Sequence, residues 1–255
     1  MRSLALVLAA LVLAGCGGKH AAAPNIPPPP PFDQRCGVKT DSTARSLWFR
    51  ATDGTLLDGV ELGEGARGVI LLHQSPNDLC GWALYAPILA RQGFHLLLVD
   101  LRAFGLSHRG PYGGRRGAEA DVRGAVDELK ELGAEKVALV GASYGGVAEL
   151  VAAPALDSDV AGVASLSGEL ALPNSQLDAL RAVPDLTAPL LVMGSREDGS
   201  LDERDARRLV RAAGSEQKSL VEFDGELHGW DLLYNEETKT RANRLLVEFL
   251  RRVTE

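Results

Sequence analysis

The chain has 255 residues, of which 45% are hydrophobic and 24% are charged, so it can bury a sizeable core as a globular α/β protein. Its net charge of −7 at pH 7 argues against a nucleic-acid partner, since phosphates attract basic surfaces. No pair of histidines or cysteines has metal-ligand spacing, and no lysine follows a glycine-rich turn as in a P-loop. We therefore expect neither a metal nor a cofactor.

The N-terminus has the pattern of an export signal. A short cationic start, Met1 to Ser3, precedes an apolar run from Leu4 to Leu13 that is too short to span a bilayer as a helix. The residues Leu13-Ala14-Gly15-Cys16 then resemble the lipobox of bacterial lipoproteins, in which cleavage precedes a cysteine that becomes lipidated. The resemblance implies that residues 1–15 are a signal peptide. It also implies that Cys16 holds the exported protein at a membrane of the bacterial cell envelope. An ordinary secretory signal with an incidental cysteine is the alternative.

A proline-rich stretch follows the signal. Pro24 and residues 27–31, all proline, favour the extended polyproline II form, which cannot join a helix or a sheet interior. Residues 16–44 are therefore predicted to be a tether between Cys16 and a domain of residues 45–255. A ligand for a proline-recognising partner is the alternative interpretation.

Strand and helix patterns alternate along the rest of the chain. Two apolar runs, 46–50 and 56–60, flank Asp53-Gly54, which predicts a hairpin at an antiparallel edge. Buried strands are predicted at 68–72, 94–99, 137–140, 160–166, 190–193 and 219–223. Helices are predicted at 82–92, 118–132, 147–151, 175–182, 201–213 and 238–253. This alternation indicates a mostly parallel sheet with helices on both faces.

One serine lies between a predicted strand and the helix after it. Ser143 is flanked by Gly141 and Gly145, in the pattern G-x-S-x-G. A Cβ at either glycine would clash where strand and helix pass closely, and the sharp turn leaves the serine hydroxyl accessible. This arrangement is typical of a nucleophile elbow. A serine hydroxyl reacts only when a base takes its proton, and that base needs a group to orient it.

The candidates for base and acid follow Ser143 in the chain. Of the five histidines, only His228 lies beyond the serine, in the loop after the last strand. The acid is expected in the loop after the preceding strand, where we assign Asp198, with Glu197 and Asp202 as alternatives. A simpler interpretation is that His228 is a surface residue and Asp198 a loop or helix-capping residue.

An oxyanion formed at Ser143 would need two backbone N–H donors. One is expected from Tyr144, directly after the nucleophile. The other is expected from the loop His73-Gln74-Ser75, where Ser75 is the first candidate and Gln74 the alternative. Gln74 could instead present its amide to substrate.

These motifs resemble those of the α/β-hydrolase superfamily, from about residue 45 to the end. The elbow 141–145 is one of its more specific marks, and residues 100–107 are similar to its D-x-R-G-x-G-x-S stretch, with Ala103 in place of a glycine. His73 matches the family's histidine and Ser75 its oxyanion donor, whereas Gln74 replaces the usual glycine. The resemblance implies the α/β-hydrolase fold. Many members carry a helical lid, but only residues 167–188 are available for one here, so we expect little or no lid.

The resemblance also implies acyl chemistry on a small-molecule substrate. We expect a serine hydrolase of carboxylesterase type, with a peptidase or acyltransferase of the same fold, or a non-catalytic anchored binding protein, as alternatives. Haloalkane dehalogenases carry aspartate at the elbow and are disfavoured by Ser143. The loop 109–117 contains several arginines. They are either simply solvated or attract an anionic substrate. Cys36 and Cys80 remain after Cys16 and are free to form a disulfide or to stay unpaired.

Overall fold

The computed structural model describes residues 26–39 and 44–255, which form an eight-stranded sheet ordered β1-β2-β4-β3-β5-β6-β9-β10. β1 pairs antiparallel with β2, and β2 with β4, whereas all later neighbours are parallel. The strands of the sheet are β1 (Arg45–Arg50), β2 (Leu56–Leu62), β3 (Arg67–Leu72), β4 (His95–Val99), β5 (Lys136–Ala142), β6 (Gly162–Leu166), β9 (Leu190–Ser195) and β10 (Lys218–Phe223). The predicted hairpin edge and mostly parallel sheet are confirmed.

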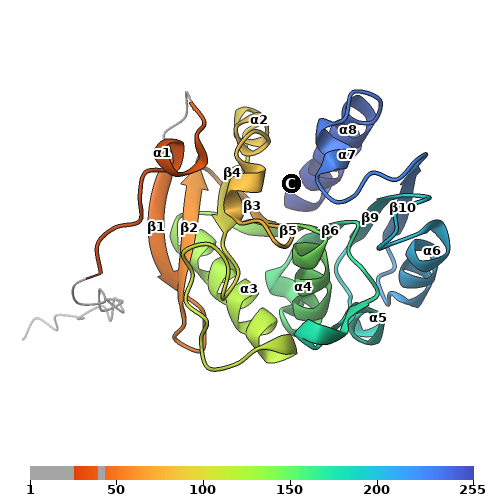
Figure 1. Cartoon of the computed structure of the whole chain (residues 1–255), viewed down its shortest axis with the longest axis horizontal. Helices are drawn as coiled ribbons and strands as arrows, with labels where there is room; N and C mark the ends of the chain where they lie inside the picture. The colour runs from red at the N-terminus through yellow and green to blue at the C-terminus, as the bar shows by residue number, and fades with distance from the viewer. Residues whose placement is uncertain (1–25, 40–43) are drawn as a thin grey trace, which may run out of the picture.

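Helices cover both faces of the sheet (Figure 1). One face carries α3 (Gly114–Glu131), α4 (Tyr144–Ala152), α5 (Ala179–Ala182) and α6 (Glu203–Ala212). The other carries α1 (Phe32–Cys36), α2 (Ala86–Arg91), α7 (Asp231–Tyr234) and α8 (Lys239–Thr254). No helix in the described part of the chain is long and apolar enough to cross a membrane.

A hydrophobic core lies on each face of the sheet, which explains why the central strands are apolar throughout. In β3, Ile70 and Leu72 pack into one layer and Val69 and Leu71 into the other, and all four are fully buried. Successive strand residues point to opposite faces, so a strand covered on both sides must be apolar throughout. Each such side chain contributes about 1.5–3 kcal/mol of burial free energy.

Two predicted helices differ from the structure. The predicted helix 82–92 is a 3₁₀ turn, Leu79–Trp82, followed by α2, because Pro87 is tolerated only in a first turn and α2 begins just before it. Of the predicted helix 175–182, only the second half, α5, is helical. The first half contains β8 (Leu177–Asp178), which forms a short hairpin with β7 (Ala171–Leu172). Gln176 has a left-handed φ of 54°, which no continuous helix accommodates. Other 3₁₀ turns lie at Ala153–Ala155, Asp157–Asp159, Pro173–Ser175 and Val183–Asp185.

Residues 26–39, the described stretch of the predicted tether before residue 44, contact the domain. Trp48 Nε1 donates to the Pro27 carbonyl at 2.7 Å, and Phe32 is only 1% exposed. Cys36 and Cys80 form a disulfide, with their Cα atoms 5.1 Å apart. The predicted boundary at residue 45 therefore does not separate packed from unpacked chain, since the proline content concealed these contacts. The predicted signal peptide and Cys16 lie outside the described residues.

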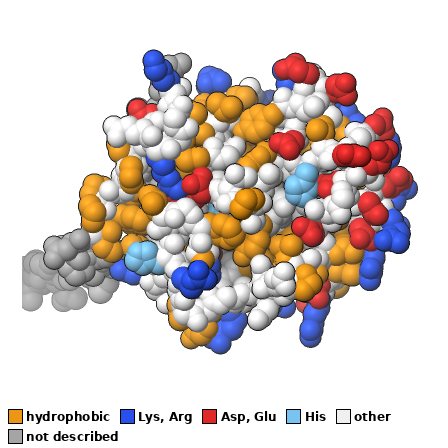
Figure 2. All heavy atoms as spheres, viewed as in Figure 1, with side chains coloured by type: hydrophobic (Ala, Val, Ile, Leu, Met, Phe, Trp, Pro, Cys, Tyr) orange, Lys and Arg blue, Asp and Glu red, His pale blue; other side chains and the backbone are white. Residues whose placement is uncertain are grey.

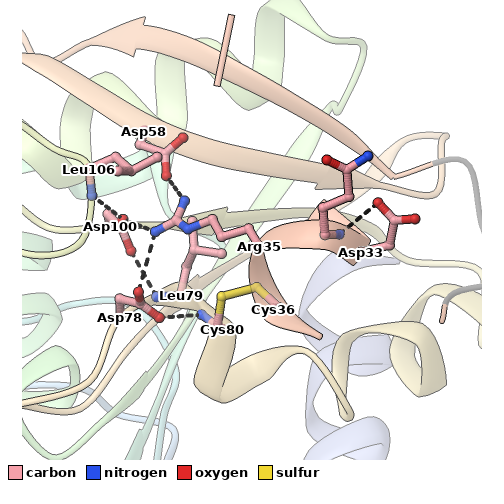
Figure 3. The surroundings of a disulfide bond; sticks show 10 residues. Asp33, Arg35, Cys36, Asp58, Asp78, Leu79, Cys80, Asp100 and Leu106 are labelled. Atoms are coloured by element: carbon pink, nitrogen blue, oxygen red, sulfur yellow. Dashed lines mark hydrogen bonds and ion pairs between the residues drawn. A yellow bond between two sulfur atoms is a disulfide. The ribbon is translucent and has the colours of Figure 1, made fainter. Parts of the chain in front are cut away.

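A buried charge cluster joins this N-terminal segment to the sheet (Figure 3). In this Arg35 cluster, the Arg35 guanidinium pairs with Asp58 on β2 and Asp100 after β4, and lies 3.4 Å from Asp78. Both Asp58 and Asp100 are fully buried. Asp100 also accepts hydrogen bonds from the backbone N–H groups of Leu79, at 2.8 Å, and Leu106, at 2.9 Å. The cluster thus fixes two loops at the carboxyl edge of the sheet.

Candidate active site

The backbone at Ser143 is held in a strained turn between β5 and α4. Its φ of 49° and ψ of −112° fall outside the ordinary regions, a conformation that costs on the order of 1–3 kcal/mol. Gly145 N–H donates to the His73 carbonyl at 3.1 Å, and Val147 N–H to the Ser143 carbonyl at 2.9 Å. A Cβ on Gly141 would strike the Gly145 backbone, and one on Gly145 would strike the Leu72 backbone. Both glycines are therefore required by close approach of the strands to α4.

Asp198 and His228 come together from the loops after β9 and β10. His228 Nδ1 lies 2.9 Å from Asp198 Oδ2 and 3.0 Å from Oδ1. Asp198 is 2% exposed, and its Oδ1 also accepts from Ser200 N–H at 2.9 Å. With Nδ1–H donated to the carboxylate, His228 Nε2 is left as a proton acceptor. Glu197 is exposed and Asp202 caps α6, so neither alternative acid contacts His228.

The pair supports opposite charges on its two members. Burial alone would raise the pKa of the Asp198 carboxyl, but hydrogen bonds from His228 and Ser200 hold that pKa below its ordinary value. The hydrogen bond to Asp198 raises the pKa of His228 above its ordinary value, against the effect of burial. An imidazolium formed during a reaction would therefore be stabilised here.

Ser143 and His228 line one cavity of about 520 Å³, which we call the active-site cavity. Its walls include two predicted oxyanion candidates, Ser75 and Tyr144, and the hairpin residues Ala171 to Ser175. Tyr144 is the first residue of α4, where backbone N–H groups have no partner within the helix. This short hairpin and α5 form the segment between β6 and β9, so the prediction of little or no lid agrees with the described residues.

The Gln74 side chain points to the loop that carries His228, whereas the sequence suggested that it could present its amide to substrate. Its side-chain Oε1 accepts from Trp230 N–H at 3.4 Å and fills the space beside Gly229. Gln74 is absent from the lining of the active-site cavity, whereas Ser75 is part of it. The side chain therefore braces the loop that carries His228 and does not present its amide to this cavity.

Glu169 is a cavity residue that sequence reasoning missed. It follows the carboxyl end of β6 and lines the active-site cavity together with His228. Burial raises the pKa of Glu169, while the charge of His228 opposes that rise and the charge of Asp198 adds to it. Its position directly after a buried strand is the signal that could have identified it.

The remaining residues that match the family motifs hold loops in position. His73 Nε2 accepts from Leu101 N–H at 3.2 Å, and burial lowers the pKa of this imidazole. Arg102 bonds to Asp121 at 2.8 Å and to Asp53 at 2.9 Å. Ala103 takes a left-handed φ of 67°, so the turn that glycine favours is kept without glycine.

A metal-binding arrangement is not apparent at this site. Across residues 26–39 and 44–255, no three His, Cys, Asp or Glu side chains are grouped so that they could hold a metal ion.

Sequence comparison finds relatives over about half of the chain. Residues 69–189 match the family model for the α/β hydrolase fold. The chain is 39% identical over 137 residues to epoxide hydrolase A of Mycobacterium tuberculosis, an alignment covering 51% of this chain and 41% of that protein. It is 30% identical over 134 residues to bifunctional epoxide hydrolase 2 of Rattus norvegicus, covering 51% of this chain and 24% of that protein. The chain thus spans less than half the length of these relatives.

Structural comparison extends over most of the chain. An esterase of Pyrococcus furiosus superposes with a TM-score of 0.68 at 19% identity, covering 88% of this chain and 96% of that one. A monoacylglycerol lipase of Paleococcus ferrophilus gives a TM-score of 0.66 at 19% identity, covering 77% and 99%. At this identity the likeness concerns the fold alone. With the sheet order and the match to the family model, these comparisons show that the chain has the α/β-hydrolase fold.

Proposed function

We propose that the protein is a serine hydrolase that cleaves an ester or related acyl substrate through an acyl-enzyme, with Ser143 as nucleophile, His228 as base and Asp198 as orienting acid. One observation carries the proposal. His228 hydrogen-bonds the buried Asp198 carboxylate at 2.9 Å and lines the same cavity as Ser143. An oriented imidazole beside an elbow serine is the arrangement that makes a hydroxyl nucleophilic.

The proposed reaction has two similar halves. His228 Nε2 takes the proton of the Ser143 hydroxyl as its oxygen attacks the substrate carbonyl, and Asp198 stabilises the imidazolium. N–H groups of Tyr144 and Ser75 hold the oxyanion, and one such donor contributes on the order of 10²–10³ in rate. His228 then protonates the departing alcohol. Water, activated in the same way, releases the acyl group from Ser143.

The relatives named epoxide hydrolases suggest a different electrophile, which Ser143 disfavours. Opening an epoxide with a serine oxygen would leave an alkyl ether on the enzyme, and water does not readily cleave an ether. Attack on a carbonyl leaves an ester, which water does cleave. The nucleophile therefore supports an acyl substrate over an epoxide.

Nucleophile labelling tests the proposal and separates an enzyme from a binding protein. We expect a fluorophosphonate probe to label the wild-type protein and the exposed-serine control Ser219→Ala, but not Ser143→Ala. Hydrolysis of p-nitrophenyl butyrate should fall on the order of 10⁶-fold in Ser143→Ala. Equal labelling or turnover in Ser143→Ala would overturn the assignment. A panel with amides and an added alcohol acceptor then separates an esterase from a peptidase or acyltransferase.

We further propose that the protein is exported and anchored to a membrane of the bacterial cell envelope through lipidated Cys16. The lipobox-like residues 13–16 after an apolar run support this proposal. Palmitate should label the wild-type protein, and Cys16→Ala should release it from the membrane fraction. A membrane-bound, unlabelled Cys16→Ala protein would contradict the anchor.

A further inference from the structure

A second cavity, of about 470 Å³, opens beside the active-site cavity. It lies between the 101–114 loop and the start of α4, and its walls include Phe104, Tyr112 and Ala148. The two cavities share Tyr144, Asn174 and Ser175 as common lining residues. We call it the side cavity. The side cavity is therefore adjacent to the cavity that Ser143 lines.

The positions of the leaving group and the acyl group in the proposed mechanism indicate which part of the substrate would lie in the side cavity. In the proposed mechanism the alcohol leaves towards His228, since His228 protonates it. His228, Glu169 and Ser200 line the active-site cavity but not the side cavity. The acyl group stays on Ser143, and Tyr144 directly after it borders the side cavity. The side cavity therefore adjoins the acyl side.

The charges around the side cavity are not all neutralised. Arg102 is 8% exposed and is fully occupied by Asp121, Asp53 and the Tyr112 carbonyl, which it contacts at 2.6 Å. Arg109 also lines the side cavity, is exposed, and has no acidic partner among the described residues. The lining of the side cavity is mixed, with Phe104, Tyr112 and Tyr144 beside polar side chains. An arginine at the border of such a space is suited to a carboxylate at the end of a methylene chain.

The opposite end of the site has the opposite sign. Glu169 and His228 line the active-site cavity, and Figure 2 shows many acidic side chains, with some Lys and Arg side chains among them, on the side of this face that carries α6 and β10. An anionic group is repelled from that end and attracted towards Arg109. This asymmetry favours one orientation of a charged substrate.

We propose that the side cavity is the acyl subsite and that it takes an acyl chain ending in a carboxylate, so that the substrates are half-esters of dicarboxylic acids. The inference rests on the proposed serine-hydrolase function and names the substrate class of that site. Arg109 pairs with the free carboxylate, and Phe104 and Tyr112 contact the methylene chain.

Three p-nitrophenyl esters test the subsite with one constant leaving group. These are the mono-p-nitrophenyl ester of adipic acid, its neutral methyl p-nitrophenyl diester, and p-nitrophenyl acetate, whose acyl group has neither a methylene chain nor a carboxylate. In Arg109→Gln, kcat/KM for the half-ester should fall about fivefold through KM, the upper range for an exposed ion pair, with both neutral esters unchanged. Arg109→Lys should restore most of the loss. Added salt should weaken the wild-type preference for the half-ester.

A matched arginine and a cavity-filling variant complete the test. Arg115 lies on the same segment but pairs with Glu119 at 2.6 Å and does not line the side cavity, so Arg115→Gln should leave the half-ester unaffected. Gly113 lines the cavity, and a Cβ there meets no atom within 4 Å, so Gly113→Phe adds a bulky side chain at the cavity wall without a clash. This variant should slow both adipate esters and spare the acetate.

The outcomes separate the subsite from the chemistry. Equal effects of Arg109→Gln and Arg115→Gln on the half-ester, or equal effects of Gly113→Phe on acetate and adipate, would overturn the acyl subsite while Ser143-dependent acetate hydrolysis persists. Loss of all ester turnover in the wild-type protein, or its survival in Ser143→Ala, would instead overturn the serine-hydrolase function itself.

Discussion

Buried aspartates follow strands in two regions of this molecule, and their partners differ. In the Arg35 cluster, Asp100 after β4 faces a guanidinium, whereas Asp198 after β9 faces the imidazole of His228. Arginine keeps its proton at every ordinary pH, so the Arg35 cluster can only hold loops together. Histidine exchanges its proton near neutral pH and can take part in a reaction. Burial of a carboxylate thus does not by itself identify a catalytic acid, and the partner is the informative feature.

Access to the cavity separates the two regions further. The His228 side chain is 28% exposed and lines the active-site cavity, whereas the Arg35 side chain is 10% exposed and lines neither that cavity nor the side cavity. Substitutions in the first region should therefore change turnover, and substitutions in the second should change stability.

The largest expected effect is on turnover. Asp198→Asn should lower kcat/KM for p-nitrophenyl butyrate by on the order of 10⁴-fold, because the amide no longer orients His228 or stabilises its cation. The folded state should persist by circular dichroism. Asp202→Asn is the matched control, since asparagine keeps the N-cap of α6 and Asp202 is remote from His228. Comparable losses in both variants would show that Asp198 has no special role.

The second effect is on stability. Arg35→Met should lower the free energy of unfolding by about 3–5 kcal/mol, because it leaves two buried carboxylates without their cation. Arg45→Met removes a pair with Glu61 in which the arginine is 56% exposed, and should cost less than about 1 kcal/mol. Urea unfolding measures both values. Adding Asp58→Asn to Arg35→Met should recover part of the loss, and a still lower stability would contradict this account.

The disulfide should contribute somewhat less. Replacing both Cys36 and Cys80 by alanine removes a cross-link between positions 44 residues apart, and should lower the free energy of unfolding by about 2–4 kcal/mol. A reductant should destabilise the wild-type protein by a similar amount and leave the double variant unchanged. Because Arg35 and Cys36 are neighbours on α1, we expect the two losses to be less than additive when combined.

The smallest expected effect is a shift of the pH profile. His228 must be neutral to act as base, so kcat/KM should rise with pH through the pKa of His228, which its hydrogen bond to Asp198 holds above the usual value. Glu169→Gln should move this rise to lower pH by less than about one unit, since the Glu169 charge also raises the pKa of His228. A shift to higher pH would contradict that sign.

In the Arg35 cluster, the titration of Asp58 should make the free energy of unfolding depend on pH. Burial raises the pKa of Asp58 to about 7, with Arg35 opposing and Asp100 adding to the rise. A carboxyl with a raised pKa stabilises the fold at low pH, and this contribution is lost as pH increases through about 7.

Local patterns predicted the parts of the structure that local physics determines. Ser143 was identifiable because its turn requires glycine on both sides, and the parallel sheet because doubly covered strands such as β3 are continuously apolar. Chain order suggested Asp198 and His228, which the structure brings into contact.

Long-range contacts decided the features that were missed. Arg35 meets aspartates from three separate segments, and no periodicity in the sequence connects them. Glu169 is defined by its neighbours across the cavity, and the β7–β8 hairpin by a left-handed Gln176 that nothing in its residue type required. A disulfide between Cys36 and Cys80 was one of two open alternatives, and only their 5.1 Å Cα–Cα distance in the fold decided it.

The docking of residues 26–38 has a mechanical consequence for an anchor at Cys16. Only ten peptide units separate Cys16 from Ile26, and a chain of that length spans at most about 35 Å, close to the thickness of a bilayer's hydrocarbon core. A force on that chain would first load the hydrogen bond between the Pro27 carbonyl and Trp48 on the edge strand β1. It would then reach α1, from which the Cys36–Cys80 bond leads to the loop after β3. An anchor at Cys16 would thus act on the edge strand and on a central loop at the same time.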